Sequence, residues 1–321
     1  MPHITFIHGI ANKPKEDQLL KLWKESLLQD FLGNGDGIDL DNSGVTTSMI
    51  YWADLLYDSA LEEGVFESAE GFENGETVAV KDNADPDMAW RGELKGDEKE
   101  TVDALAAKLS FDVLVNDDFQ PPNAEIANTL ERIPLPWFVK RRMMKWLLRD
   151  VHHYLFNYES APRPGERFMV QEEIRRRVLE KLKAGSELPG PHIVISHSMG
   201  TVISYDCLKR VPECPSIDGL MTIGSPLGLD EIQDNFSPEW TREDGFPGKL
   251  NGQWINVYDM LDPVTGFDSN ISNDYKKGGA EIIEVINEQN WGAWRHNITN
   301  YLSGPKLRVA INKLLNRNTI L

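Results

Sequence analysis

The chain has 321 residues and a formal net charge of −18 at pH 7, with 51 acidic against 33 basic side chains. A chain of this length can bury a full core in one large α/β domain, or in one domain that carries an insertion. The acidic balance argues against a nucleic-acid partner, because phosphate binding needs a basic face.

The composition also bears on the compartment. The chain has two cysteines, Cys207 and Cys214, and these form neither a disulfide framework nor a metal-binding spacing, which fits a reducing environment. The segment Met1–Ile7 lacks the basic start and the long apolar core of a signal peptide. The sequence also contains no run of about 18 apolar residues, the length that a membrane-spanning helix needs. We therefore expect a cytoplasmic protein.

The first part of the chain follows an α/β rhythm. A short strand, Ile4 to Ile7, is followed by an amphipathic helix from about Glu16 to Phe31 and by a second strand from Val45 to Trp52. The intervening loop begins like a calcium-binding loop at Asp39, but its twelfth position is Ile50 instead of the glutamate that calcium needs. We expect an acidic turn there, and no metal site.

The region 61–165 departs from this rhythm and is predicted to be an inserted cap or lid. Residues 62–103 carry 14 acidic and 4 basic side chains, which is typical of a solvated loop, although 101–114 has a helical pattern. Residues 134–158 are basic and aromatic instead. Two interpretations of that segment stay open: a lid or cap helix over an apolar substrate pocket, or an ordinary helix packed on the body of the protein. A lid of this kind could also make peripheral membrane contact.

After the insertion the alternation of helices and strands resumes. A polar helix from Phe168 to Lys183 has three successive arginines, 175–177, which we expect to form a solvated face. The remaining predicted strands are His192–Ser196, Leu220–Ile223, Trp254–Tyr258 and Glu281–Ile286, and a closing helix spans Leu307–Leu315. The pattern predicts one α/β domain, 1–321, with a mainly parallel sheet of about six strands and helices on both faces.

The most informative stretch is Ser196-His197-Ser198-Met199-Gly200. It follows a β-branched run and precedes an apolar helical pattern that starts at Val202. This order predicts a strand, a sharp turn and a helix, with Ser198 at the apex, as in the nucleophile elbow G-x-S-x-G. The first glycine of that pattern is replaced here by Ser196, another small residue.

A serine hydroxyl needs a base within hydrogen-bond reach, and histidine suits this role because its pKa lies near neutral pH. Of the seven histidines, His296 follows the last predicted strand, at the carboxyl edge where open α/β sheets bind ligands. His197 should point away from its neighbour Ser198. His8 should shape the loop after the first strand.

The base in turn needs an acid to orient it. Asp259 and Asp262 both follow a strand that lies between the serine and the histidine in the sequence. We favour Asp262, because its turn lies farther past the strand and could reach across to His296. The other aspartate is then expected to cap a turn.

The third requirement is a pair of backbone N–H donors for a tetrahedral oxyanion. Met199, directly after the serine, would supply one of them at the start of a helix. Gly9 or Ile10, in the loop after the first strand, would supply the other.

With serine, acid and histidine in this order, the chain resembles the α/β-hydrolase superfamily, and within it the lipase- and esterase-like serine hydrolases. The resemblance rests on His8-Gly9, the Ser198 elbow, Gly224-Ser225-Pro226, Asp262-Pro263-Val264 and His296. It covers about residues 1–60 and 190–303. It implies a six-stranded core with the N-terminal strand inside the sheet, an acyl-enzyme formed on Ser198, and no cofactor.

The leading hypothesis is therefore a hydrolase of carboxylic esters, with a small-molecule or lipid ester as substrate. Thioester hydrolysis or acyl transfer would use the same three residues. A non-catalytic binding or signalling protein on a hydrolase scaffold is the alternative from another class, and the insertion 61–165 could carry an interaction module beside catalysis.

Overall fold

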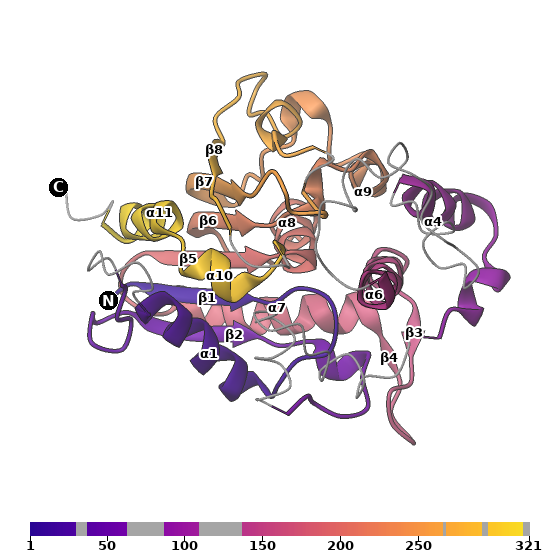
Figure 1. Cartoon of the computed structure of the whole chain (residues 1–321). Coiled ribbons are helices and arrows are strands. Elements are labelled where there is room, and N and C mark those ends of the chain that lie inside the picture. Colours follow the sequence, from indigo (N-terminus) through magenta and orange to yellow (C-terminus); the bar gives the residue numbers. More distant parts are fainter. Residues whose placement is uncertain (30–36, 63–86, 109–136, 266–267, 291–294, 317–321) are drawn as a thin grey trace.

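The computed structural model describes residues 1–29, 37–62, 87–108, 137–265, 268–290 and 295–316, and only the backbone of 137–143 and 316. Its centre is a six-stranded sheet in the order β2-β1-β5-β6-β7-β8 (Figure 1), in which every neighbouring pair is parallel. The strands are β1 (His3–Ile7), β2 (Thr46–Ile50), β5 (His192–His197), β6 (Ile217–Ile223), β7 (Leu250–Tyr258) and β8 (Glu284–Asn287). The predicted α/β architecture is confirmed, with β1 inside the sheet.

Helices surround this sheet. The α-helices are α1 (Glu16–Leu28), α4 (Gly96–Lys108), α6 (Trp137–Leu155), α7 (Val170–Ser186), α8 (Met199–Arg210), α9 (Asp230–Gln233), α10 (Ile298–Leu302) and α11 (Pro305–Asn316). Single 3₁₀ turns lie at η1 (Ala53–Leu55), η2 (Ala89–Glu93), η3 (Pro226–Gly228), η4 (Asp234–Phe236), η5 (Arg242–Asp244) and η6 (Ile271–Asn273). A small antiparallel ribbon of β3 (Glu159–Ser160) and β4 (Phe168–Met169) precedes α7.

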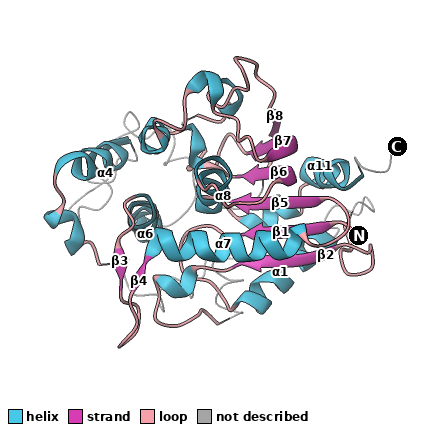
Figure 2. Ribbon diagram, turned by 180° about the vertical axis from the view of Figure 1, so that it is seen from behind, coloured by secondary structure: helices cyan, strands magenta, loops and turns pink. Residues whose placement is uncertain are grey.

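Two hydrophobic clusters cover the two faces of the sheet. On β5, Ile193 and Ile195 face the cluster built with α1, α10 and α11, whereas Val194 faces the cluster built with α6, α7 and α8. This alternation follows from the two-residue period of a strand. Figures 1 and 2, seen from opposite sides, show α1, α10 and α11 over one face and α7 and α8 over the other.

The strand order reverses between β1 and β5. From β1 the chain moves outward to β2, and it then returns to the other side of β1 to form β5 and the strands beyond. Open α/β sheets bind ligands at such a point, outside the carboxyl ends of the strands. The loop after β1 and the turn after β5 both lie there, so the topology brings His8 and Ser198 to one place.

The described part of α6 is integrated into the body of the protein. Met144, Leu147, Leu148 and Val151 are buried in the same hydrophobic cluster as Met199 of the elbow. Of the two interpretations of this segment, core packing accounts for these side chains. Residues 134–136 and the side chains of 137–143, on which the membrane interpretation partly rests, lie outside the description.

Several boundaries differ from the sequence prediction. The first helix ends at Leu28 instead of Phe31, β8 begins at Glu284 instead of Glu281, and Phe168 belongs to β4 instead of α7. Each difference falls at an element end, where hydrophobic periodicity is weakest as a signal. Most of the acidic stretch, 63–86, and the end of the predicted helix 101–114 lie outside the described residues.

The arginines of α7 are a larger departure. Arg175 makes two hydrogen bonds, of 2.7 and 2.8 Å, to the buried carboxylate of Asp206 on α8, and Arg177 pairs with Asp54. The predicted solvated face is therefore wrong for these two residues. Their partners lie 31 and 123 positions away in the sequence, where helical periodicity carries no information.

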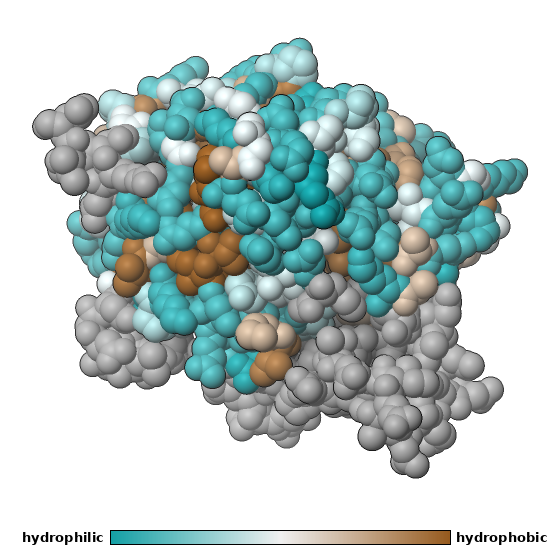
Figure 3. Space-filling view, turned by 90° about the horizontal axis from the view of Figure 1, so that it is seen from above, coloured by the Kyte–Doolittle hydropathy of each residue, from teal (hydrophilic) through white to brown (hydrophobic). Residues whose placement is uncertain are grey.

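Figure 3 shows one face of the molecular surface, which is mostly hydrophilic with small hydrophobic areas between the polar side chains. Among the described residues, no helix combines the length and the apolar character that crossing a membrane requires.

Candidate active site

Ser198 sits on a strained turn between β5 and α8. Its φ of 54° and ψ of −126° are unusual for a residue other than glycine. Such a conformation costs about 1–3 kcal/mol and persists only where the surroundings impose it. Here the Ser198 N–H donates to the Ile223 carbonyl of β6 at 2.9 Å, and the Thr201 hydroxyl donates to the Ser198 carbonyl at 2.7 Å.

The backbones around this turn are in close contact, as an elbow requires. A Cβ on Gly200 would lie 2.6 Å from the Ile7 carbonyl oxygen, and a Cβ on Gly9 would lie 2.6 Å from the Ser198 Cβ. Ser196, which replaces the first glycine of the pattern, is tolerated because its buried hydroxyl has partners. It lies 3.1 Å from the Ser204 hydroxyl and 3.2 Å from the Met221 carbonyl.

His296 and Asp262 form the acid–base pair of the site. His296 Nδ1 lies 2.9 and 2.8 Å from the two carboxylate oxygens of Asp262, and both side chains are buried. Asp262 also accepts the Tyr301 hydroxyl at 2.9 Å and the Val264 N–H at 2.8 Å. The carboxylate is thus held by three donors and fixes the orientation of the imidazole.

This pair lies beside the elbow. The Ser198 N–H bonds to Ile223, and a Cβ on the next residue, Gly224, would come within 3.1 Å of both Asp262 Oδ2 and the His296 ring. The residue before Ser198 also contacts the pair: the centroid of the His197 ring lies 4.6 Å from that of the His296 ring. Gly224 is required here twice over, by this close approach and by its φ of +56°.

Asp259, the alternative acid, has other partners. Its Oδ1 accepts the Leu261 N–H at 2.6 Å and its Oδ2 lies 3.5 Å from Arg295 Nη1. Burial raises the pKa of Asp259 above its ordinary value. This carboxylate caps its own turn, and the aspartate in contact with His296 is Asp262.

The serine hydroxyl itself is buried, and Ser198 Oγ has no hydrogen-bond partner among the described residues. Leaving a buried hydroxyl unpaired costs about 1–3 kcal/mol, so such a group calls for an explanation. In proteins without substrate, a catalytic hydrogen bond is often long and forms fully only in the complex.

The loop after β1 is fixed by His8. Its Nδ1 donates to the Gly9 carbonyl at 2.8 Å, while its Nε2 accepts the Trp52 N–H at 3.0 Å, and its ring stacks on Trp52. Burial, and secondly the charge of Lys13, lower the pKa of His8 to about 3. His8 is therefore neutral and has the structural role expected of it.

This arrangement presents two backbone donors beside the serine. Met199 begins α8 directly after Ser198, and Gly9 and Ile10 follow His8 across from it. Within the described part of the chain, the N–H groups of Met199 and Ile10 donate to no acceptor. Two such donors next to a hydroxyl are what an oxyanion site requires.

Two contributors escaped the sequence analysis. His197 Nε2 donates to the backbone carbonyl of His296 at 3.0 Å. Burial first, and then the neighbouring His296, hold the pKa of His197 well below its usual value, so it acts as a neutral donor. Tyr301 bonds to Asp262 and accepts the N–H of Asp259 at 2.8 Å. No motif distinguishes either residue in the sequence.

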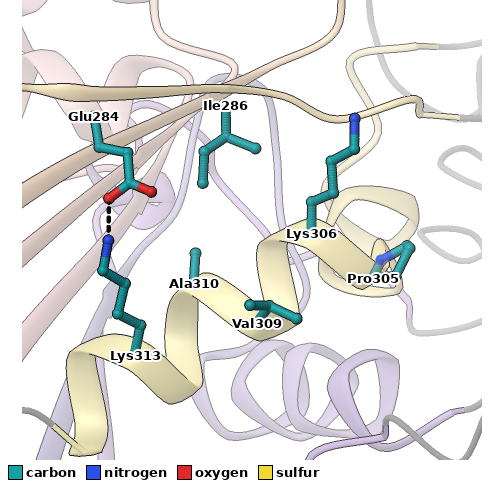
Figure 4. A pocket seen from close by; sticks show the side chains of 7 residues that line it. All are labelled: Glu284, Ile286, Pro305, Lys306, Val309, Ala310 and Lys313. Atoms are coloured by element: carbon teal, nitrogen blue, oxygen red, sulfur yellow. Dashed lines mark hydrogen bonds and ion pairs between the residues drawn. The ribbon is translucent and has the colours of Figure 1, made fainter.

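An open hollow of about 350 Å³ lies away from these residues, between β8 and α11 (Figure 4). Its lining includes Ile286, Val309 and Ala310, with an ion pair between Glu284 and Lys313 at one end. None of the residues of the elbow, the β1 loop or the acid–base pair lines it. It is therefore not the place where this serine would meet a substrate.

As for metals, the described residues contain no group of three or more histidine, cysteine, aspartate or glutamate side chains arranged to hold an ion. A scan against protein-family models finds no family that matches this chain, and a search of curated proteins finds no match.

Proposed function

We propose that the protein is a serine hydrolase of the α/β-hydrolase type that cleaves carboxylic esters through an acyl-enzyme on Ser198. The observation that carries the proposal is the buried His296–Asp262 pair, held against a strained elbow whose serine hydroxyl has no partner in the described structure. A purely structural serine would not need both the strain and an oriented imidazole beside it.

In the first half of the reaction, His296 Nε2 takes the Ser198 proton as Oγ bonds to the ester carbonyl carbon. The carbonyl oxygen becomes an oxyanion that accepts hydrogen bonds from the Met199 and Ile10 N–H groups. Asp262 stabilises the imidazolium that forms. When the carbon–oxygen bond of the ester breaks, His296 returns the proton to the departing alcohol.

In the second half, His296 removes a proton from water, the resulting hydroxide adds to the acyl carbon, and Ser198 leaves with its proton restored. The carboxylic acid is released. The same residues would act on thioesters, or would transfer the acyl group to an alcohol or thiol acceptor. Small-molecule or lipid esters are the proposed substrates. Membrane contact through 134–158 and a cytoplasmic location remain predictions.

The test is turnover of p-nitrophenyl esters of graded chain length by the wild type and by Ser198→Ala. The variant should retain its fold and lose hydrolysis by about 10⁴-fold or more, because the nucleophile is gone. The matched control is Ser26→Ala, which removes another buried serine hydroxyl, whose hydrogen bond among the described residues lies within α1, to the Leu22 carbonyl. It should keep wild-type turnover.

If Ser198→Ala retained turnover, the nucleophile would have to be another residue. Wild-type protein that hydrolyses no ester or thioester would favour the binding-protein alternative. Addition of butanol or a thiol acceptor distinguishes hydrolysis from acyl transfer, because a transferase would form the new ester or thioester in place of the free acid.

A further inference from the structure

The loop that would form half of the oxyanion site is held at its far end by α6. The Ala11 N–H donates to Asp150 Oδ2 at 2.9 Å, across 139 positions of sequence. The Asp150 side chain is fully buried. Asp150 lies near the carboxyl-terminal end of α6, so the region inserted between β2 and β5 contacts the β1 loop directly.

The backbone at Ala11 needs such a partner. Its φ is +68°, in the left-handed region that costs a residue with a Cβ about 1–2 kcal/mol. Ile10, whose N–H would bind the oxyanion, lies between this strained residue and the His8–Trp52 contact described above. The loop is thus held on both sides of the donor, by Trp52, two residues past the end of β2, through His8, and by α6 through Asp150.

A carboxylate next to an oxyanion site would ordinarily oppose catalysis, because it repels the developing negative charge. Here Arg149 neutralises it, since its Nε and Nη2 lie 3.0 and 2.7 Å from Asp150 Oδ1. Burial acts to lower the pKa of Arg149, but the Asp150 charge outweighs it and the net pKa is raised, so the guanidinium stays charged. Tyr57 completes the cluster: its hydroxyl donates to Asp150 Oδ2 at 3.4 Å, and its ring lies under the guanidinium at 4.6 Å.

We propose that Asp150 is a positioning residue of the oxyanion loop and that Arg149 is the counter-charge that makes its carboxylate compatible with catalysis. Asp150 fixes the peptide at Ala11 and, through it, the direction of the Ile10 N–H; it does not touch the substrate. The inference rests on the proposed ester hydrolysis, and it makes α6 a required part of the catalytic unit.

The first test replaces Asp150 with alanine and follows kcat and KM with p-nitrophenyl butyrate, together with inhibition by butylboronic acid, which forms a tetrahedral adduct on the serine. Because the loop acts in the transition state, kcat should fall about tenfold to a hundredfold while KM stays within about threefold. The boronic acid should bind more weakly by a similar factor.

The matched control is Asp206→Asn. Asp206 is another fully buried carboxylate paired with an arginine, Arg175, but its bonds join α6, α7 and α8 and do not involve the β1 loop. This variant should lose stability and keep kcat. If Asp150→Ala keeps kcat within twofold of wild type, or if both variants lose kcat in proportion to their loss of stability, the positioning role is wrong.

A second pair of variants tests the charge argument without removing the hydrogen bond. Arg149→Met leaves the Asp150 charge uncompensated and should lower kcat about tenfold. Adding Asp150→Asn in that background keeps an oxygen for the Ala11 N–H and removes the charge, so kcat should recover to within about threefold of wild type. No recovery in the folded double variant would overturn the assignment of Arg149. If the wild type showed no Ser198-dependent turnover, the proposed function would be wrong, and this inference would be wrong with it.

Discussion

Two aspartates follow β7, and one of them contacts the imidazole of His296. Asp262 bonds to His296 through both carboxylate oxygens, while Asp259 caps its own turn. Asp262→Asn should lower kcat by about 10³- to 10⁴-fold, because an amide can no longer hold the imidazole in the required tautomer. Asp259→Asn is the matched control and should retain most activity. Equal losses in the two variants, measured with p-nitrophenyl butyrate, would contradict the assignment.

Gly9 tests how closely the β1 loop must approach the elbow. Gly9→Ala would place a methyl group 2.6 Å from the Ser198 Cβ, so the loop or the serine has to move. We expect kcat to fall at least about tenfold, because oxyanion donors are effective only at hydrogen-bond distance. Gly92→Ala, where the added methyl would meet nothing within 4 Å, should leave kcat unchanged. Normal turnover by the Gly9 variant would mean that this loop does not bind the oxyanion.

At the residue scale, the sequence allows a proposal only for the groups whose chemistry dictates their residue type. Ser198, Asp262 and His296 could be selected because each follows a strand at one edge of the sheet. His197, Tyr301 and Asp150 could not, because they act through long-range hydrogen bonds that leave no pattern in the sequence.

At the scale of elements, the question is whether α6 is a separate lid or part of the body. Leu148 is fully buried in the cluster that also contains Met199. Leu148→Ala should therefore lower the free energy of unfolding of the whole domain by about 2–5 kcal/mol. Val309→Ala, at a position that is 66% exposed, should change it by less than about 0.5 kcal/mol.

Urea unfolding followed by tryptophan fluorescence and by ester turnover would check this. If α6 belongs to the main core, both probes should shift together in Leu148→Ala. A separate early transition, with the main transition unchanged, would show that α6 folds as an independent lid.

The elements themselves were largely predictable, since alternating strands and amphipathic helices dictate a parallel sheet with helices around it. The packing of the insertion was not. Hydrophobic periodicity shows that α6 has an apolar side but does not say what that side contacts. The pairing of Arg175 with Asp206 was missed for the same reason.

At the scale of the whole molecule, buried neutral histidines should make stability depend on pH. Burial lowers the pKa of His8 to about 3 and that of His192 to about 4, and it holds the pKa of His197 well below its usual value. In the unfolded chain these groups titrate near pH 6.5. The unfolded state therefore binds more protons below that pH, and the free energy of unfolding falls as the pH drops from about 6.5 towards 4.

Each such histidine contributes up to about 1.4 kcal/mol per pH unit in that window. Urea midpoints at pH 7.5 and pH 5 should accordingly differ, with the lower value at pH 5. His192→Gln should reduce the difference, because it removes one of these groups. The same midpoint at both pH values would show that these histidines are not buried in their neutral form.

The central claim is that Asp262 and His296 make the hydroxyl of Ser198 reactive. The most direct measurement is the intact mass of the protein after treatment with a fluorophosphonate, followed by peptide mapping of the adduct. We predict one adduct per chain, on Ser198, and none on the Ser198→Ala variant. An unmodified wild-type protein, or an adduct on another residue with Ser198 unmodified, would contradict the account.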